Sequence, residues 1–453
     1  MKDKLKGLVV KILTKESELV LNKFKPRVIA ITGNVGKTTT KDFIYAVLTP
    51  PGLPLAGEEQ VPKVRAAEKS QNSEFGVCLT ILGEKNAWNN LAAWLRLLTV
   101  GFVKEYFTLK YKCALKKYPE KLILEIGADH PGDIKHITSF VKPNIVVLTA
   151  FQETPTHGEF FQTIEQHIRE KKYLVDAIKP GGTICYNADD EVMSKMARSV
   201  EGLKDVNLIS FGKSESVNVR ISESKNIYDS EQEVLGTRVK LNVGGEMLEV
   251  DLIGVLGEAQ NYSLAAAVSV GLQEGMGLQE IGEAIKNNFA PTPSRMRILR
   301  GVNNSKILDD CYNASPVAVE NAVAVLKNTF VKGKKIVVLG HMAELGDKTK
   351  DAHIEQAKNI ASVADIIIFS GRYNEYYLEG ARQAKFPAEK IFLASGADEV
   401  NKIITENNLL KENDLLFVKG SQSARLEKVV TEFLFDKRDA EKVCRQDAEW
   451  KLR

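Results

Sequence analysis

The feature that most constrains the fold is a short glycine-rich loop near the start of the chain. An apolar run, RVIAIT (27–32), ends at the loop Gly33-Asn34-Val35-Gly36-Lys37-Thr38, and the segment TTKDFIYAVL (39–48) that follows has the composition of a helix. A strand, a glycine loop and a helix in this order open a parallel α/β sheet. We therefore expect an α/β fold built around this loop.

The composition of the loop predicts that it binds phosphate, although it is two residues shorter than the usual spacing. Glycines let backbone N–H groups turn toward an anion, the start of the following helix adds positive potential, and Lys37 adds a full charge. The Thr38 hydroxyl is suited to Mg²⁺. A purely structural turn is the alternative, but the position between a clear strand and a clear helix favours nucleotide binding. The predicted contacts are Gly33, Asn34, Val35, Gly36, Lys37, Thr38 and Thr39.

Apolar runs typical of buried parallel strands recur in both halves of the chain. They lie at 121–127, 144–150, 181–187, 335–340, 364–371, 390–394 and 415–420, with helix-like segments between them. Residues 216–253 instead alternate apolar and polar side chains around Gly244-Gly245, which predicts an antiparallel edge or a small antiparallel subsheet. The Pro-containing segment 290–297 predicts a domain boundary. We expect an N-terminal helix or extension (1–26), a central P-loop ATPase domain with a parallel sheet (27–298) and a Rossmann-like C-terminal α/β domain (299–453).

The composition excludes several other classes of protein. The chain has 62 Lys and Arg against 59 Asp and Glu, and this net charge of +3 argues against a general nucleic-acid binder. The five cysteines are scattered, which is typical of reduced thiols in a cytosolic protein. No secretory signal is recognisable, and the most apolar segment, around 94–103, is too short to span a bilayer. We therefore expect a cytoplasmic protein.

Three further side chains are candidates for the same site. Glu125 ends the run KLILEIG, where a carboxylate would lie at the ligand-binding edge of a parallel sheet and would suit Mg²⁺. His157 follows the loop after the next strand, and Lys171 lies in a helix-like run. Taken alone, each has an ordinary explanation: a carboxylate that caps a turn, a loop histidine and a surface lysine.

These residues belong to a set of motifs that resembles the Mur ligases, and most closely the members that add D-alanyl-D-alanine to a muramyl tripeptide. The motifs appear in the family's order from about residue 27 to residue 430: TGNVGKTTTK (32–41), LEIGADHPGDI (124–134), the loop ending in His157, REKKYL (169–174), NADD (187–190), SRMRIL (294–299), DDCYNASP (309–316), LGHMAELGD (339–347) and VKGSQSARLEKVV (418–430). The resemblance implies an ATP-dependent amide ligase of peptidoglycan precursor synthesis, with a muramyl peptide and D-Ala-D-Ala as substrates.

The resemblance also implies a role for individual residues. Lys37 and the loop amides would hold the ATP phosphates, and Thr38 and Glu125 would ligate a first Mg²⁺. His157 and Lys171, the latter carbamylated by CO₂, would organise a second metal site. The remaining matches are nucleotide contacts at Gln260, Arg295, Asp310, Tyr312 and Asn313, and substrate contacts at Asn72, Glu74, Lys419, Ser421 and Arg425.

The sequence departs from the family pattern at several points. Ser294 stands before Arg295 where the family has Gly, and the adenine-side motif is reduced to Gln260 as a plausible contact. Only 26 residues precede the first strand, where family members of this type carry a domain that grips uridine diphosphate. We therefore expect uridine diphosphate to contribute little to recognition.

Segment 85–117 is expected to form an extra amphipathic helix with Trp88 and Trp94 and several lysines. Such a helix either packs on the central domain or contacts a membrane surface or a partner, so the protein is expected to be cytoplasmic and in the second case peripheral to the inner membrane face. We expect a monomer. Two alternatives to the proposed reaction remain: a Mur-like ligase for another peptide or poly-amino-acid, and a non-catalytic, nucleotide-gated scaffold of envelope assembly.

Overall fold

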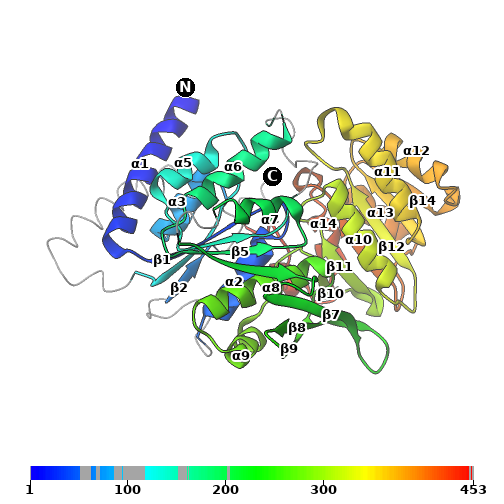
Figure 1. Cartoon of the computed structure of the whole chain (residues 1–453). Coiled ribbons are helices and arrows are strands. Elements are labelled where there is room, and N and C mark those ends of the chain that lie inside the picture. The colour runs from blue at the N-terminus through cyan, green and yellow to red at the C-terminus, as the bar shows by residue number, and fades with distance from the viewer. Residues whose placement is uncertain are drawn as a thin grey trace.

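The computed structural model describes residues 2–50, 63–67, 72–85, 94, 118–151, 161, 163–200, 205–447 and 450. The predicted His157 and, apart from Lys85 and Trp94, the predicted helical segment 85–117 lie outside these residues. The described part contains two sheets, and helices lie on both faces of the parallel part of each sheet (Figure 1). The α/β class predicted from the strand–loop–helix opening is confirmed.

The first sheet has nine strands in the order β2-β3-β1-β4-β5-β6-β7-β8-β9. It is parallel from β2 to β7 and antiparallel from β7 to β9, so the predicted antiparallel unit is the edge of this same sheet. The strands are β1 (Arg27–Thr32), β2 (Val64–Ala66), β3 (Lys121–Glu125), β4 (Ile145–Leu148), β5 (Thr183–Asn187), β6 (Asn207–Gly212), β7 (Val219–Tyr228), β8 (Val234–Val243) and β9 (Glu246–Ile253). Gly244 and Gly245 form the predicted turn, with φ of 60° and 96°.

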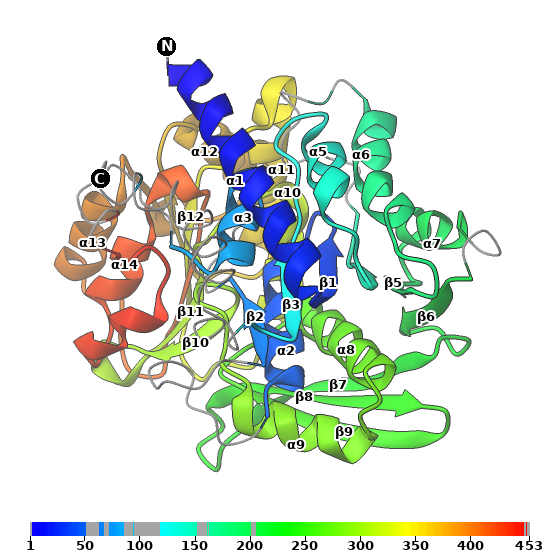
Figure 2. The same cartoon turned by 90° about the vertical axis from the view of Figure 1, so that its left-hand side faces the viewer.

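Two layers of helices cover this sheet (Figures 1 and 2). One layer holds α1 (Lys2–Phe24), α3 (Glu74–Leu82), α5 (Asp133–Phe140), α6 (Ile164–Asp176) and α7 (Glu191–Arg198), and the other holds α2 (Lys37–Leu48), α8 (Glu258–Gln273) and α9 (Leu278–Asn288). Among the described residues, no helix combines the length and the apolar character that crossing a membrane requires.

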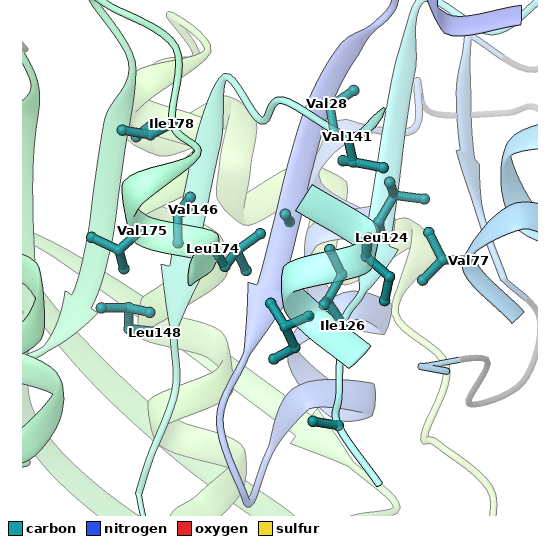
Figure 3. Close-up of a cluster of buried hydrophobic side chains, with 14 of the residues drawn as sticks. Val28, Val77, Leu124, Ile126, Val141, Val146, Leu148, Leu174, Val175 and Ile178 are labelled. Atoms are coloured by element: carbon teal, nitrogen blue, oxygen red, sulfur yellow. The ribbon is translucent and has the colours of Figure 1, made fainter. Parts of the chain in front are cut away.

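The side chains of β1 show how the sheet separates two cores. Val28 and Ala30 belong to one core, and Ile29 and Ile31 belong to the other, because successive strand residues point to opposite faces. Figure 3 shows the first core, where Leu124 of β3 and Leu174 of α6 are among the packed side chains. Burial on both faces fixes the sheet, and the sheet fixes where the loops after its strands lie.

The second sheet has six strands in the order β10-β11-β15-β12-β13-β14, of which only β10 runs antiparallel to its neighbour. They are β10 (Arg297–Arg300), β11 (Lys306–Asp310), β12 (Lys335–Gly340), β13 (Ile366–Ser370), β14 (Ile391–Ala394) and β15 (Leu415–Lys419). Its helices are α10 (Pro316–Asn328), α11 (Thr349–Ala361), α12 (Asn374–Gln383), α13 (Ala397–Glu406) and α14 (Glu427–Glu432), with short 3₁₀ segments that include η5 (Lys437–Lys442). The predicted second α/β sheet is confirmed.

Candidate functional site

Residues from both sheets line one cleft of about 1980 Å³. Many of the residues that line it follow the C-terminal ends of β1, β3, β4 and β5 in the first sheet and of β11 and β15 in the second, and others come from β7, α8, α10 and the C-terminal tail. It collects these predicted site residues: Asn34, Val35, Gly36, Lys37, Thr38, Thr39, Asn72, Glu125, Gln260, Arg295, Asp310, Tyr312, Asn313 and Lys419. Gly33, Glu74, Lys171, Ser421 and Arg425 are not among the residues that line it.

The glycine loop depends on its two glycines for its path. Gly33 has a φ of 149°, and a Cβ there would lie 2.0 Å from the Thr149 hydroxyl oxygen. Gly36 is the N-cap of α2 and has a left-handed conformation with φ of 84°. Left-handed backbone is accessible to glycine without the cost that other residues incur. The loop therefore places the start of α2, with its unpaired N–H groups, at the cleft.

The Lys37 ammonium group makes two hydrogen bonds to the backbone of this loop. Its Nζ donates to the carbonyl oxygens of Gly33 at 2.8 Å and Asn34 at 3.2 Å. Burial lowers the pKa of Lys37, and Arg295 adds to this effect while the carboxylates of Glu125 and Asp129 oppose it. The cation therefore lies between the loop and acidic side chains of the cleft, where an anionic ligand would be attracted to it.

Thr38 and Glu125 form a pair of oxygen ligands beside this cation. The Thr38 hydroxyl donates to Glu125 Oε1 at 3.1 Å, and both side chains are buried. Glu125 reaches the loop because β3 pairs with β1 in parallel register, with Glu125 opposite Ile31. A hydroxyl and a carboxylate are hard oxygen ligands of the kind that Mg²⁺ prefers, so this donor set fits the predicted first metal.

Lys171 lies behind the loop on α6 and is only 2% exposed, so its interpretation as a surface lysine is wrong. Its Nζ is 3.3 Å from His167 Nε2 and 3.5 Å from the Gly33 carbonyl oxygen. Burial and the Lys37 charge together lower the pKa of Lys171 to about 7, with burial the larger cause and Glu170 opposing both. The amine is therefore partly uncharged near neutral pH.

The side chains beside Lys171 were not predicted as site residues. His167 precedes it by four residues on α6, a spacing that places both on one helix face and that would have been the available signal. The Glu170 carboxylate accepts hydrogen bonds from the N–H groups of Gly132 at 2.9 Å and Ile134 at 2.7 Å. These bonds hold the start of α5, and the segment after β3, in place at the cleft.

On the other wall, Asp310 connects the second sheet to the segment that precedes it. Its carboxylate pairs with the Lys419 ammonium of β15 and accepts from the Met296 N–H at 3.2 Å. Lys419 also donates to the Asn313 carbonyl oxygen at 3.2 Å. Because Met296 lies in the segment between the sheets, Asp310 fixes that segment relative to the second sheet.

Arg295 and Gln260 lie next to this connection. The Arg295 guanidinium stacks 4.1 Å above the centre of the Tyr312 ring. Gln260 donates from Nε2 to the Arg295 carbonyl oxygen at 3.1 Å, while its buried Oε1 has no hydrogen-bond partner among the described residues. A buried acceptor without a partner is costly, so a ligand that donates an N–H group, such as a nucleotide base, fits here.

Of the predicted substrate residues, Asn72 and Lys419 line the cleft, and Glu74, Ser421 and Arg425 do not. Asn72 lines the cleft next to Gly127, whose N–H donates to the Asn72 carbonyl oxygen at 2.8 Å. Glu74 instead begins α3, with a carboxylate oxygen 3.9 Å from His136. Ser421 is buried with its hydroxyl 3.1 Å from that of Ser423, and Arg425 donates to Glu427 at 2.5 Å.

Comparison with known proteins gives two family matches. The Mur ligase middle domain matches residues 104–270, and the Mur ligase, glutamate ligase domain matches residues 294–422. Together they account for well over half of the chain. Among curated relatives, the UDP-N-acetylmuramoyl-tripeptide--D-alanyl-D-alanine ligase of Bacillus subtilis is 23% identical over 415 residues, which are 91% of this chain and 77% of that protein.

Solved structures share the fold. The MurF ligase from Thermotoga maritima in complex with ADP superposes with a TM-score of 0.69 at 23% identity and covers 96% of this chain and 84% of that one. A folylpolyglutamate synthase from Thermotoga maritima gives a TM-score of 0.59 at 15% identity, with 97% and 95% covered. These likenesses show that the fold of this chain is shared with both structures.

Proposed function

Because the chain belongs to the Mur ligase family, we propose that it is an ATP-dependent amide ligase that joins D-alanyl-D-alanine to a muramyl tripeptide. The observation that carries this proposal is the shared cleft, where Lys37 and the Thr38–Glu125 pair face Asp310 and Lys419 of the other sheet. Relatives with this substrate pair are matched along most of the chain, whereas the likeness to folylpolyglutamate synthase concerns the fold.

In the proposed reaction, the tripeptide carboxylate attacks the γ-phosphorus of ATP and gives an acyl phosphate and ADP. The amine of the dipeptide then attacks the acyl carbon, and phosphate leaves as the amide bond forms. A carboxylate and a triphosphate repel each other, so positioning and charge neutralisation dominate catalysis. The Lys37 ammonium and the N–H groups of the loop would hold the phosphates and lower this repulsion.

We propose that Thr38 and Glu125 hold Mg²⁺, which neutralises phosphate charge and orients the oxygens when it is bound. Lys171 would react with CO₂ through its uncharged amine, lose a proton and become an anionic carbamate. The pKa near 7 supports this step, because the free amine is the nucleophile. His157, together with this carbamate, would serve a second metal.

The nucleotide base would lie toward Gln260, whose Oε1 is available as an acceptor, and near the stacked Arg295–Tyr312 pair. Asn313 would contact the nucleotide from the second sheet. Movement of the second sheet onto the loop would complete the site and exclude water, which otherwise hydrolyses an acyl phosphate. Asn72 and Lys419 would face the acceptor peptide from opposite walls, and Glu74, Ser421 and Arg425 remain proposed substrate-side residues.

One chain supplies both walls of the cleft, which supports action as a monomer. The reaction consumes ATP, and we place it in the cytoplasm for that reason. The contact of segment 85–117 with a membrane or partner stays a proposal on the basis of its sequence alone.

The test is ADP release from ATP with a UDP-muramoyl tripeptide, with and without D-Ala-D-Ala, and mass spectrometry of the product. We expect ADP release that depends on the dipeptide and a product heavier by one D-Ala-D-Ala residue pair. ADP release with another amine, such as glutamate, would identify the alternative Mur-like ligase. Nucleotide binding without turnover for any amine would favour the non-catalytic scaffold.

A further inference from the structure

The C-terminal tail of the chain forms part of the cleft. After α14 the chain passes through η5, and the residues beyond it return to the cleft wall, where Cys444, Arg445, Gln446, Asp447 and Trp450 line it. The C-terminal family match ends at residue 422, so none of these residues belongs to it. The tail is therefore a part of the site that the family motifs do not describe.

Arg445 joins this tail to the segment after β11. Its guanidinium donates to the carbonyl oxygens of Cys311, at 3.2 Å, and Tyr312. It also lies 5.4 Å from the centre of the Tyr312 ring. With a side chain only 4% exposed, Arg445 has little freedom to move away. The backbone of the segment that carries Tyr312 is thus held by one side chain more than 130 positions away.

The same guanidinium reaches the substrate-side motif. It donates to Glu427 Oε2 at 3.1 Å, and Glu427 Oε1 accepts from Arg425 Nε at 2.5 Å. Arg425 in turn donates to the Trp450 carbonyl oxygen at 2.9 Å. Arg445 therefore stands between Tyr312 on the nucleotide side and Arg425 on the substrate side.

A metal could be considered at this point, because Cys311, Glu427 and Cys444 present ligand atoms within 4.8 Å of one another. Arg445, however, donates both to Glu427 and to Cys444 Sγ, at 3.1 Å and 3.2 Å. The guanidinium charge of Arg445 therefore already occupies the position that a metal cation would take. The cluster is better explained as the group of side chains that holds Arg445.

We propose that Arg445 is a positioning residue for nucleotide binding, which rests on the proposed function. The Tyr312 ring contacts two guanidinium groups: that of Arg295 lies 4.1 Å from the ring centre and that of Arg445 lies 5.4 Å from it. The position of the ring therefore depends on both arginines. Loss of the Arg445 hydrogen bonds releases the Tyr312 backbone and weakens the nucleotide contacts of this wall. A planar guanidinium that bridges two carbonyl oxygens is not replaced by an ammonium group.

The experiment measures the Kd of Mg-ADP by calorimetry, together with the melting temperature, for R445K and R445Q. The matched control is R438Q, because Arg438 lies in the same tail but is exposed and pairs with Asp436. We expect R445Q to bind ADP at least about tenfold more weakly, about 1.4 kcal/mol, with R445K between R445Q and the wild type. We expect R438Q to bind as the wild type does. A folded R445Q with wild-type affinity would overturn the proposal.

Removing Arg445 leaves the buried Glu427 with one partner fewer, which endangers folding. The double variant E427Q/R445Q removes both charges, so it should regain much of the melting temperature but not the ADP affinity. Recovery of both would show that Arg445 is only a structural cation. ADP binding needs no acceptor, so a wild-type protein that binds ADP without dipeptide-dependent turnover would contradict the proposed reaction and leave this inference standing.

Discussion

The hydroxyl of Thr38 donates a hydrogen bond of 3.1 Å to the carboxylate of Glu125, although 87 residues separate them along the chain. The contact exists because β1 and β3 are neighbours in parallel register, so the loop after one strand meets the last residue of the other. Both side chains are buried at the edge where ligands of open α/β sheets bind. This pair is the most direct structural support for a metal at the cleft.

Glu125→Gln should therefore lower activity strongly and raise the Mg²⁺ concentration needed for half-maximal rate. The amide keeps an acceptor for Thr38 but loses the charge that a hard cation requires. We expect a fall in rate of at least about tenfold at saturating ATP, about 1.4 kcal/mol. The measurement is a Mg²⁺ titration of ADP release, with E191Q as the control because Glu191 is exposed and pairs with Lys195. An unchanged Mg²⁺ requirement would remove Glu125 from the metal site.

Lys37→Ala should abolish ligation and leave the fold intact. Within the described residues its ammonium group donates to carbonyl oxygens of the loop itself, so its loss costs little packing, whereas the phosphates would lose a cation. Product formation and circular dichroism are compared with K195A, a change at an exposed lysine. A decrease smaller than about tenfold would mean that the loop does not bind the transferred phosphate.

Most of the parallel strands that the sequence predicted are buried on both faces, whereas β7 to β9 were predicted from their alternating pattern. Residues 28–31 of β1 are all fully or almost fully buried, and such runs leave a continuous apolar signal. Strand β11 was missed because it ends in Asp309 and Asp310, two carboxylates that a pattern of burial does not anticipate. Strand β2 was missed because it is only three residues long.

The residues of the candidate site also divide into those that a local sequence pattern predicts and those that it does not. The place of Lys37 and Thr38 at the cleft was predictable because the loop that carries them is a local motif, and that of Glu125 was predictable because it ends an apolar strand. Arg445 was not, because its partners Cys311 and Tyr312 lie 134 and 133 positions away and no motif surrounds it. Contacts of this kind depend on how the tail packs, which no short sequence pattern records.

Asp309 should make the stability of the protein depend on pH. Burial raises the pKa of this carboxyl to about 6, and the hydrogen bond from the Ser294 hydroxyl at 2.7 Å only partly opposes it. The folded state thus keeps a proton that the unfolded state loses near pH 4, so stability decreases as pH rises from about 4 to about 6. Asp309→Asn removes this dependence. The melting temperature of D309N relative to the wild type should rise between pH 4.5 and pH 8, and a difference that is constant with pH would contradict the assignment.

Lys171→Ala should be nearly inactive, and formate or acetate should restore part of the activity. A small carboxylate supplies the anionic oxygens that the proposed carbamate would provide, in the space left by the side chain. The matched control is K172A, since Lys172 is exposed and pairs with Asp176 at 2.5 Å. Rescue is measured as ADP release against carboxylate concentration, and a fully active K171A would remove Lys171 from the site.

The dependence on CO₂ gives a second, independent test of Lys171. With a pKa near 7, the uncharged amine falls from about nine tenths of the population at pH 8 to about one tenth at pH 6. Carbamylation needs that amine, so removal of CO₂ and bicarbonate should reduce activity more at pH 6 than at pH 8, and added bicarbonate should restore it. Carbon-13 NMR with labelled bicarbonate should show a carbamate signal in the wild type that is absent in K171A. The same signal in K171A would place the carbamate on another lysine, and its absence from the wild type would exclude the modification.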